Sequence, residues 1–183
     1  VWLGTNNQLF QFADGRARIW QFSGRHRVIF HFLDAGVFAH EAEVGLWKIQ
    51  NGEKILVNDD PQLAEDSFVF LRPTQGRKLI GLSKSGVFFL TENGKEVLGS
   101  YQLAIPNGAL SCAEQIGNLI AVGTLGSGLY LINQEGQIEY HFQPRNRDAT
   151  NLILNLKLDP YKKLWALNGT NAYILNTVYS AGF

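Results

Sequence analysis

Residues 79–95 read LIGLSKSGVFFLTENGK, in which a short polar turn separates two apolar stretches and Asn93-Gly94 follows the second. Residues 119–137, LIAVGTLGSGLYLINQEGQ, repeat the same order. The apolar stretches are short and end at turn residues, which indicates β-strands. Asn-Gly favours a type I′ hairpin, because both central residues of that turn need positive φ. The stretch therefore predicts a repeating unit of antiparallel strands.

The unit recurs along the chain with a period near 42 residues. The glycines that open one strand of successive units are Gly45, Gly86 and Gly128, and Asn171 takes the equivalent place. A period of about 42 residues, with four strands in each unit, is typical of a β-propeller blade. The sequence thus predicts an all-β fold of four-stranded antiparallel blades, and we find no convincing helix. The hairpin glycines keep the same period; they are Gly15, Gly52, Gly94 and Gly136.

The units can be placed along one propeller fragment of residues 1–183. The first unit begins at a second strand and the last ends at a third strand, so both end units are partial. Because sheet edges are seldom left exposed, we expect the chain to be part of a larger ring. A closed four-bladed ring is the alternative. The approximate units are residues 1–22, 28–58, 67–100, 109–142 and 151–176.

The composition excludes several classes of protein. Hydrophobic residues make up 45% of the chain, which excludes wholesale disorder. Sixteen basic residues balance sixteen acidic ones, which argues against a broad nucleic-acid-binding surface. A single cysteine, Cys112, excludes an internal disulfide and a cysteine-rich zinc site. We expect Cys112 to be a buried small residue.

One aromatic side chain recurs at the same position of the third strand in each unit. We expect these residues to pack blade against blade rather than to form a platform for a cofactor or a sugar. They are Phe10, Trp47, Phe88, Tyr130 and Tyr173.

The copy at residues 152–176 carries the clearest family pattern. Asp159 closes an apolar strand, Leu164-Trp165 opens the next, and Gly128-Leu129-Tyr130 fits the third strand of the preceding copy. These residues resemble the two-component-regulator propeller repeat, although Lys162-Lys163 and Asn171 stand where the family has glycine. The resemblance implies the periplasmic sensing region of a hybrid histidine kinase or of a membrane-anchored transcriptional regulator.

Candidate ligand-binding residues lie in the turns between second and third strands and in one connection between blades. These turns are rich in Asn and Ser, which suits hydrogen bonding to a polyol or an oligosaccharide but equally suits plain turn chemistry. Arginine in the connection offers a fork for carboxylates. The candidates are Asn6, Lys84, Ser85, Thr124, Arg145, Arg147, Asn168 and Asn171.

Histidines and carboxylates are weaker candidates. His26, His31, His40 and His141 could supply metal ligands, but a surface or inter-blade role fits better, since ligation needs three or four convergent groups. We read Asp59, Asp60, Glu65 and Asp66 as a solvated loop rather than as a paired-carboxylate site for glycoside hydrolysis. We assign no catalytic residue, metal or cofactor.

The function that fits best, through the family resemblance, is a ligand-sensing module of a bacterial receptor. It would bind an extracellular ligand such as an oligosaccharide without catalysis, at a periplasmic or extracytoplasmic location. The expected partners are the rest of the propeller and a C-terminal signalling module, with a homodimer as an option and no nucleic acid. The alternatives are a propeller lyase or glycosidase and a protein-binding scaffold.

Overall fold

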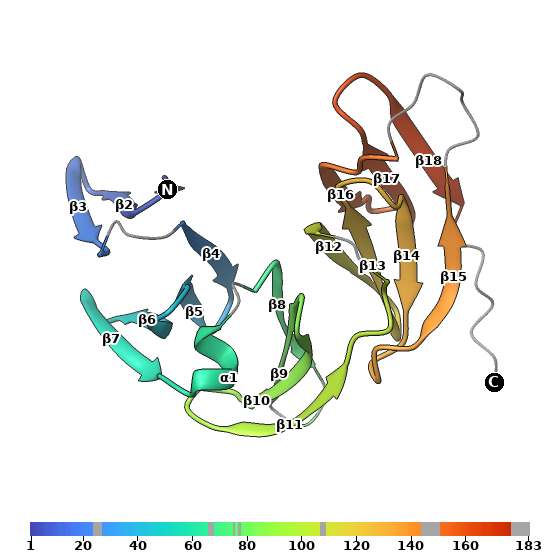
Figure 1. Ribbon diagram of the computed structural model, residues 1–183. Helices are drawn as coiled ribbons and strands as arrows, with labels where there is room; N and C mark the ends of the chain where they lie inside the picture. Colours follow the sequence, from blue (N-terminus) through green and yellow to red (C-terminus); the bar gives the residue numbers. More distant parts are fainter. Residues whose placement is uncertain are drawn as a thin grey trace. The chain divides into compact units, whose positions relative to one another are not determined.

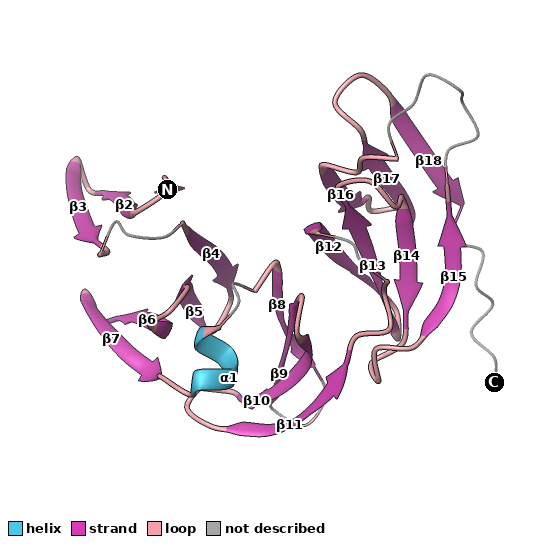
Figure 2. Ribbon diagram, in the orientation of Figure 1, coloured by secondary structure: helices cyan, strands magenta, loops and turns pink. Residues whose placement is uncertain are grey.

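The computed structural model describes residues 1–23, 27–65, 68–74, 76, 78–106, 109–143 and 151–176. Its strands form five sheets, and in every sheet the strands are neighbours in sequence order (Figures 1 and 2). The chain divides into two compact units, residues 1–83 with 88–100 and residues 84–87 with 101–183. Among the described residues, no helix has the length and hydropathy that a membrane crossing needs.

The first of these two compact units, which is larger than a single sequence repeat, holds the first two sheets and most of the third. The first sheet has three strands, β1 (Trp2–Gly4), β2 (Gln8–Ala13) and β3 (Arg16–Gln21). The second sheet has four: β4 (Val28–Leu33), β5 (Gly36–Glu41), β6 (Gly45–Gln50) and β7 (Glu53–Asn58). The third sheet consists of β8 (Phe70–Thr74), β9 (Lys78–Ser83), β10 (Gly86–Thr91) and β11 (Val97–Gln102).

The second unit holds the last two sheets. The fourth sheet consists of β12 (Leu110–Ile116), β13 (Leu119–Thr124), β14 (Leu129–Ile132) and β15 (Ile138–Phe142). The fifth has three strands, β16 (Asn155–Leu158), β17 (Lys163–Leu167) and β18 (Ala172–Asn176). The predicted all-β fold of four-stranded antiparallel sheets is confirmed.

One prediction was wrong, because a short helix, α1 (Pro61–Ala64), follows β7. The Asp60 side chain caps it by accepting a hydrogen bond from the Gln62 N–H at 2.9 Å. Proline is well suited to the first helical position, since the N–H that it lacks would have no partner there. Asp60, which we read as part of a solvated loop, therefore has a structural role.

The recurring aromatic side chains share one position in the sheets, as predicted. Trp47 lies opposite Ala39, Tyr130 opposite Val122 and Tyr173 opposite Ala166, so a smaller side chain on the second strand faces each ring. Phe88 and Tyr130 are each only 3% exposed, whereas Trp47 and Tyr173 are half-buried. Trp47, Phe88 and Tyr173 all belong to or border hydrophobic clusters formed by two sheets. These three aromatic rings therefore help to join the sheets.

Three of the hairpin glycines make a second repeated contact, a hydrogen bond with a residue that precedes their own sheet. Within the first unit, the Gly52 carbonyl accepts a hydrogen bond from Trp20 Nε1 at 3.1 Å, and the Gly94 carbonyl accepts one from Asn58 Nδ2 at 3.1 Å. Within the second unit, the Gly136 carbonyl accepts one from the Ala104 N–H at 3.1 Å. The three glycines have φ values of 84°, 77° and 78°, which are unfavourable for other residues. The Gly52 and Gly94 hairpins thus each bond to the sheet that precedes them, and the Gly136 hairpin bonds to the segment that follows β11.

The Asp–Trp pattern of residues 159–165 also has a physical cause. Trp165 Nε1 donates to Asp159 Oδ2 at 3.0 Å, and Asp159 Oδ1 accepts from the N–H groups of Tyr161 and Lys163. The hydrogen bond from Trp165 is the main reason that the pKa of Asp159 lies below its ordinary value. One carboxylate therefore closes the β16–β17 turn and orients the tryptophan.

Candidate functional site

The candidate site residues with described positions lie in four turns between second and third strands. We call the turns β1–β2, β9–β10, β13–β14 and β17–β18 the polar turns. In the β13–β14 turn, Thr124 Oγ1 donates to the Gly128 carbonyl at 2.9 Å and accepts from the Ser127 N–H at 2.9 Å. Thr124 is completely buried. Its hydroxyl therefore closes its own turn.

The β17–β18 turn is closed in the same manner by Asn168. Asn168 Oδ1 accepts from the Asn171 N–H at 2.8 Å, and Asn168 Nδ2 donates to the Tyr173 hydroxyl at 3.2 Å. Asn168 is 6% exposed, whereas the side chain of Asn171 is exposed. Of these two candidates, Asn171 is the one that a ligand can reach.

The other two polar turns carry Asn6, Lys84 and Ser85. The Asn6 carbonyl accepts from the N–H of Val28 at 2.8 Å, which ties the β1–β2 turn to the first residue of the next sheet. Lys84 and Ser85 connect β9 to β10, and both are exposed. Their exposure is compatible with the predicted contact to a ligand, which stays a prediction.

The structure brings some of the polar turns together. In the second unit, the N–H of Ile153 donates to the Thr124 carbonyl at 2.8 Å, and the N–H of Leu154 donates to the Leu167 carbonyl at 2.7 Å. The segment that enters β16 thus joins the β13–β14 and β17–β18 turns. Asn6 belongs to the other unit. Arg145 and Arg147 lie outside the described residues.

Two histidines are buried where the second sheet meets the third. His40 Nδ1 accepts from the Phe68 N–H at 3.3 Å, and the His40 ring stacks on Phe68 with centroids 4.7 Å apart. His31, on the neighbouring strand, is 4% exposed. Burial, followed by the nearby charges of His40 and Arg72, lowers the pKa of His31 from 6.5 to about 3. His31 is therefore neutral near pH 7, and the predicted inter-blade role of His40 is confirmed.

The remaining weak candidates do not gather into a metal site. Among the described residues, no three His, Cys, Asp or Glu side chains converge as ligands would. His141 is exposed; its ring stacks on Tyr130 at 4.0 Å, and its Nε2 lies 2.6 Å from the Ser127 carbonyl. Asp59 and Glu65 are exposed. His26 and Asp66 lie outside the described residues.

The buried carboxylate of Glu41 was not among the candidates. Glu41 is 1% exposed, and it accepts from the Ser23 N–H at 2.7 Å and from Trp47 Nε1 at 3.0 Å. These bonds connect the end of β5 to the first sheet and to β6. The sequence signal that could have identified Glu41 is a carboxylate six residues before a tryptophan, Trp47. Asp159 and Trp165 have the same spacing. We assign Glu41 a structural role.

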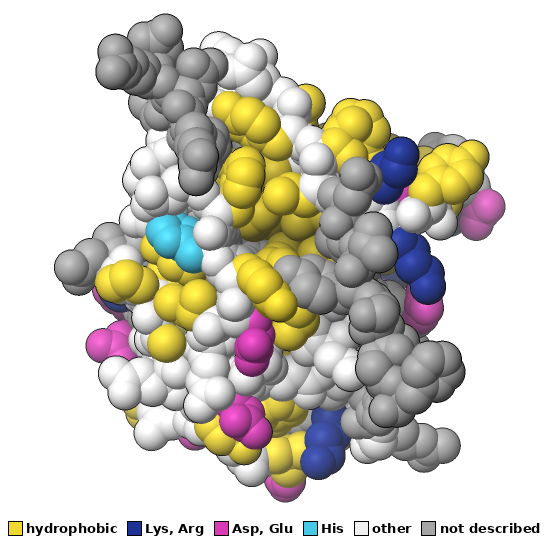
Figure 3. All heavy atoms as spheres, turned by 90° about the vertical axis from the view of Figure 1, so that its right-hand side faces the viewer, with side chains coloured by type: hydrophobic (Ala, Val, Ile, Leu, Met, Phe, Trp, Pro, Cys, Tyr) yellow, Lys and Arg dark blue, Asp and Glu magenta, His cyan; other side chains and the backbone are white. Residues whose placement is uncertain are grey.

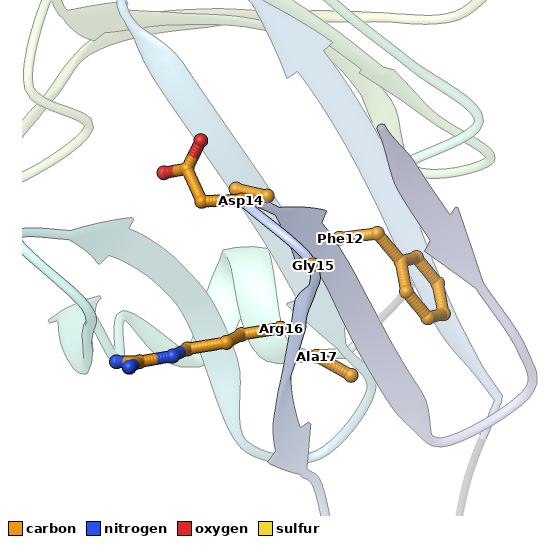
Figure 4. Close-up of a pocket in the computed structure, with 6 residues that line it drawn as sticks. Phe12, Asp14, Gly15, Arg16 and Ala17 are labelled. Atoms are coloured by element: carbon orange, nitrogen blue, oxygen red, sulfur yellow. The ribbon is translucent and has the colours of Figure 1, made fainter.

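A shallow depression lies at the β2–β3 hairpin, away from the candidate residues. Its volume is about 430 Å³, and it is lined by residues 12–17. Asp14 and Arg16 extend from one side of the hairpin, and Phe12 and Ala17 extend from the other (Figure 4). No predicted site residue lines it.

Solved structures share this fold along nearly the whole chain. A domain assigned to the extracellular part of a hybrid two-component system from B. thetaiotaomicron matches with a TM-score of 0.71 and 13% identity, over 96% of this chain and 26% of that one. A second domain, assigned to the extracellular part of a one-component system from the same organism, matches with a TM-score of 0.67 and 16% identity, over 95% of this chain and 26% of that one.

An enzyme also shares the fold. Virginiamycin B lyase from Staphylococcus aureus matches with a TM-score of 0.72 and 12% identity, over 96% of this chain and 62% of the lyase. No protein-family model matches the sequence, and neither does any curated protein. At these identities the likeness shows the β-propeller fold, which hosts many functions. The chain spans about a quarter of the length of each of these two extracellular domains.

Proposed function

We propose that the chain forms blades of an extracytoplasmic sensor propeller that binds a ligand without converting it. The observation that carries this proposal is the likeness, along at least 95% of the chain, to two domains assigned to extracellular parts of bacterial signalling systems. Binding would favour one of two arrangements of the propeller and a downstream signalling module, which is a population shift.

The ligand that suits the polar turns is an oligosaccharide. Lys84, Ser85 and Asn171 are exposed in these turns, and their side chains supply hydrogen-bond donors and acceptors for hydroxyl groups. Asn6 is also exposed, in the β1–β2 turn of the first unit, and Thr124 and Asn168 are included as residues that shape the turns. Arg145 and Arg147 complete the proposed set, because a guanidinium can hold the carboxylate of an acidic sugar with two parallel hydrogen bonds.

The experiment is a calorimetric titration of the whole protein with short neutral and uronic-acid-containing oligosaccharides. We compare the natural protein with Lys84→Ala and with Lys95→Ala as a matched control. Both lysines lie in hairpins of the third sheet, and both are exposed, but Lys95 follows β10 rather than β9. We expect Lys84→Ala to weaken binding by about tenfold or more, since it removes a hydrogen bond from a charged donor, and Lys95→Ala to leave binding unchanged.

Three results would overturn the proposal. If neither class of oligosaccharide binds, or if the two variants lose affinity equally, the polar turns are not the binding site. If mass spectrometry recovers the oligosaccharide cleaved or with an eliminated group, the protein is an enzyme. Recovery of altered oligosaccharide would favour the lyase alternative, which the likeness to virginiamycin B lyase supports.

A further inference from the structure

β11, the outermost strand of the third sheet, differs in charge from the outermost strands of three other sheets. Residues 97–113 contain no Asp, Glu, Lys or Arg, so all of β11 is uncharged. By contrast, β3 carries Arg18, β7 carries Lys54 and β15 carries Glu139. Figure 3, which views the side of β15 and β18, shows charged side chains next to hydrophobic ones. Charged side chains on an outer strand discourage pairing with another chain, and β11 lacks this protection.

The outer edge of β11 has no neighbouring strand in the part of the chain that the structure describes. β11 ends the third sheet, with β10 as its neighbour (Figure 1). Residues 103–106, which follow it, are described and form no strand. Five of the six residues of β11 are exposed, and Leu98 is 47% exposed. An edge of this kind offers main-chain N–H and C=O groups to a further strand.

Gly99 lies inside β11 at a position where the packing of the described residues does not require glycine. Its φ is not positive, and a Cβ there would meet nothing within 4 Å. By contrast, a Cβ at Gly86 of the neighbouring β10 would collide with the Tyr101 carbonyl oxygen. Glycine in the interior of a strand weakens it, and it often marks a place where another backbone approaches closely. Since no described residue approaches Gly99, that backbone would belong to another chain.

We propose that β11 pairs with β11 of a second copy of this chain, antiparallel and about a two-fold axis. A second copy fits because β11 is uncharged, so pairing it with itself brings no like charges together. The nearest charges, Lys95 and Glu96, precede the strand, and antiparallel pairing puts them at opposite ends of the pair. The two-fold pair uses the open edge of both copies, so the assembly closes at two. This inference does not depend on the proposed function.

The test is the oligomeric state of the whole protein, measured by sedimentation velocity from about 1 µM to about 1 mM, because a contact of this size forms a weak dimer. We compare the natural protein with Gly99→Lys and Leu98→Lys, each of which puts a charge on β11. Ile55→Lys is the matched control, since Ile55 lies on β7 and is 42% exposed. We expect the dimer Kd to rise at least about tenfold in both β11 variants, because like charges meet across the pair. The control should leave the dimer Kd unchanged.

Hydrogen–deuterium exchange at the two ends of this concentration range locates the interface. We expect the amides of residues 97–102 to exchange more slowly at the high concentration, because main-chain pairing protects them, and those of β7 and β15 to be unchanged. A protein that stays monomeric at the highest concentration, or protection confined to another strand, would overturn the proposal. So would a dimer that both β11 variants leave intact, or that Ile55→Lys weakens equally. Circular dichroism verifies the strands of each variant, and two β11 variants keep the test valid if one does not fold.

Discussion

At the residue scale, His31 links the stability of the second and third sheets to pH. Its pKa is about 3 in the folded protein, below its ordinary value of 6.5, mainly because of burial and then because His40 and Arg72 are near. The unfolded chain therefore binds a proton more readily than the folded one. The free energy of unfolding is therefore not reduced by His31 above about pH 6.5, and it decreases as the pH falls from 6.5 toward 3.

The pH dependence can be measured by chemical denaturation between pH 7 and pH 4. We expect the free energy of unfolding to fall more steeply for the natural protein than for His31→Leu, by up to about 1.4 kcal/mol per pH unit, the value for one proton. His141→Gln serves as the control, because His141 is exposed. Parallel pH profiles for the natural protein and His31→Leu would show that His31 does not titrate during unfolding.

Cys112 gives a second test at this scale. We predicted a buried thiol, but the structure leaves Cys112 half-buried. Burial is still the main reason that the pKa of this thiol lies above its ordinary value. Since the thiolate is the reactive form, native protein at neutral pH should react with a maleimide about tenfold more slowly than denatured protein. Equal rates in the two states would contradict the described environment of Cys112.

At the scale of elements, the hairpin glycines allow a matched comparison. Gly15 and Gly136 both have positive φ, 69° and 78°. A Cβ at Gly15 would meet nothing within 4 Å, whereas one at Gly136 would lie 2.7 Å from the Gln102 carbonyl oxygen. Both alanine variants incur the cost of left-handed backbone, and Gly136→Ala also incurs a clash. Thermal or chemical denaturation should show Gly136→Ala to be less stable than Gly15→Ala by about 1–3 kcal/mol; equal losses would contradict this contact.

Asn58 is the side chain that joins the end of β7 to the next hairpin. Its Nδ2 donates to the carbonyls of Gly94 and Lys95, each at 3.1 Å, and its Oδ1 accepts from the Asp60 N–H. Because Asn58 is 5% exposed, Asn58→Ala should lower the free energy of unfolding by about 2–3 kcal/mol. Asn93→Ala, which removes hydrogen bonds of an exposed asparagine, should cost less. Denaturation of the two variants side by side tests this order.

The local sequence pattern predicted most of the strands, but it did not predict the contacts between sheets. The Asn51-Gly52 hairpin carries its own signal, because both of its residues have positive φ as a type I′ turn requires. The same prediction was wrong for Asn93-Gly94, where only Gly94 has positive φ and five residues connect β10 to β11. Helix α1 was missed, although Asp60-Pro61 is a known start signal, since four residues give no helical periodicity. The bond from Asn58 to Gly94 joins residues 36 positions apart, and no local pattern encodes that.

At the scale of the whole molecule, the polarity of the turns predicted where candidate residues lie but not how they are used. The side chains of Thr124 and Asn168 form hydrogen bonds within their own turns, as turn chemistry alone would require. Lys84, Ser85 and Asn171 are exposed, a difference that the sequence does not record. The fold is shared with extracellular domains of bacterial two-component and one-component systems and with a lyase, so the fold alone does not decide the function.

Hydrogen–deuterium exchange of the whole protein, with and without the short neutral and uronic-acid-containing oligosaccharides, tests the sensor proposal most directly. We expect slower exchange in the polar turns, at residues 84–85 and 168–171 above all, and no change at the hairpins between third and fourth strands, such as residues 93–94. We also expect the oligosaccharides to be recovered intact. Protection confined to the hairpins between third and fourth strands, or recovery of the oligosaccharides in altered form, would contradict the sensor proposal.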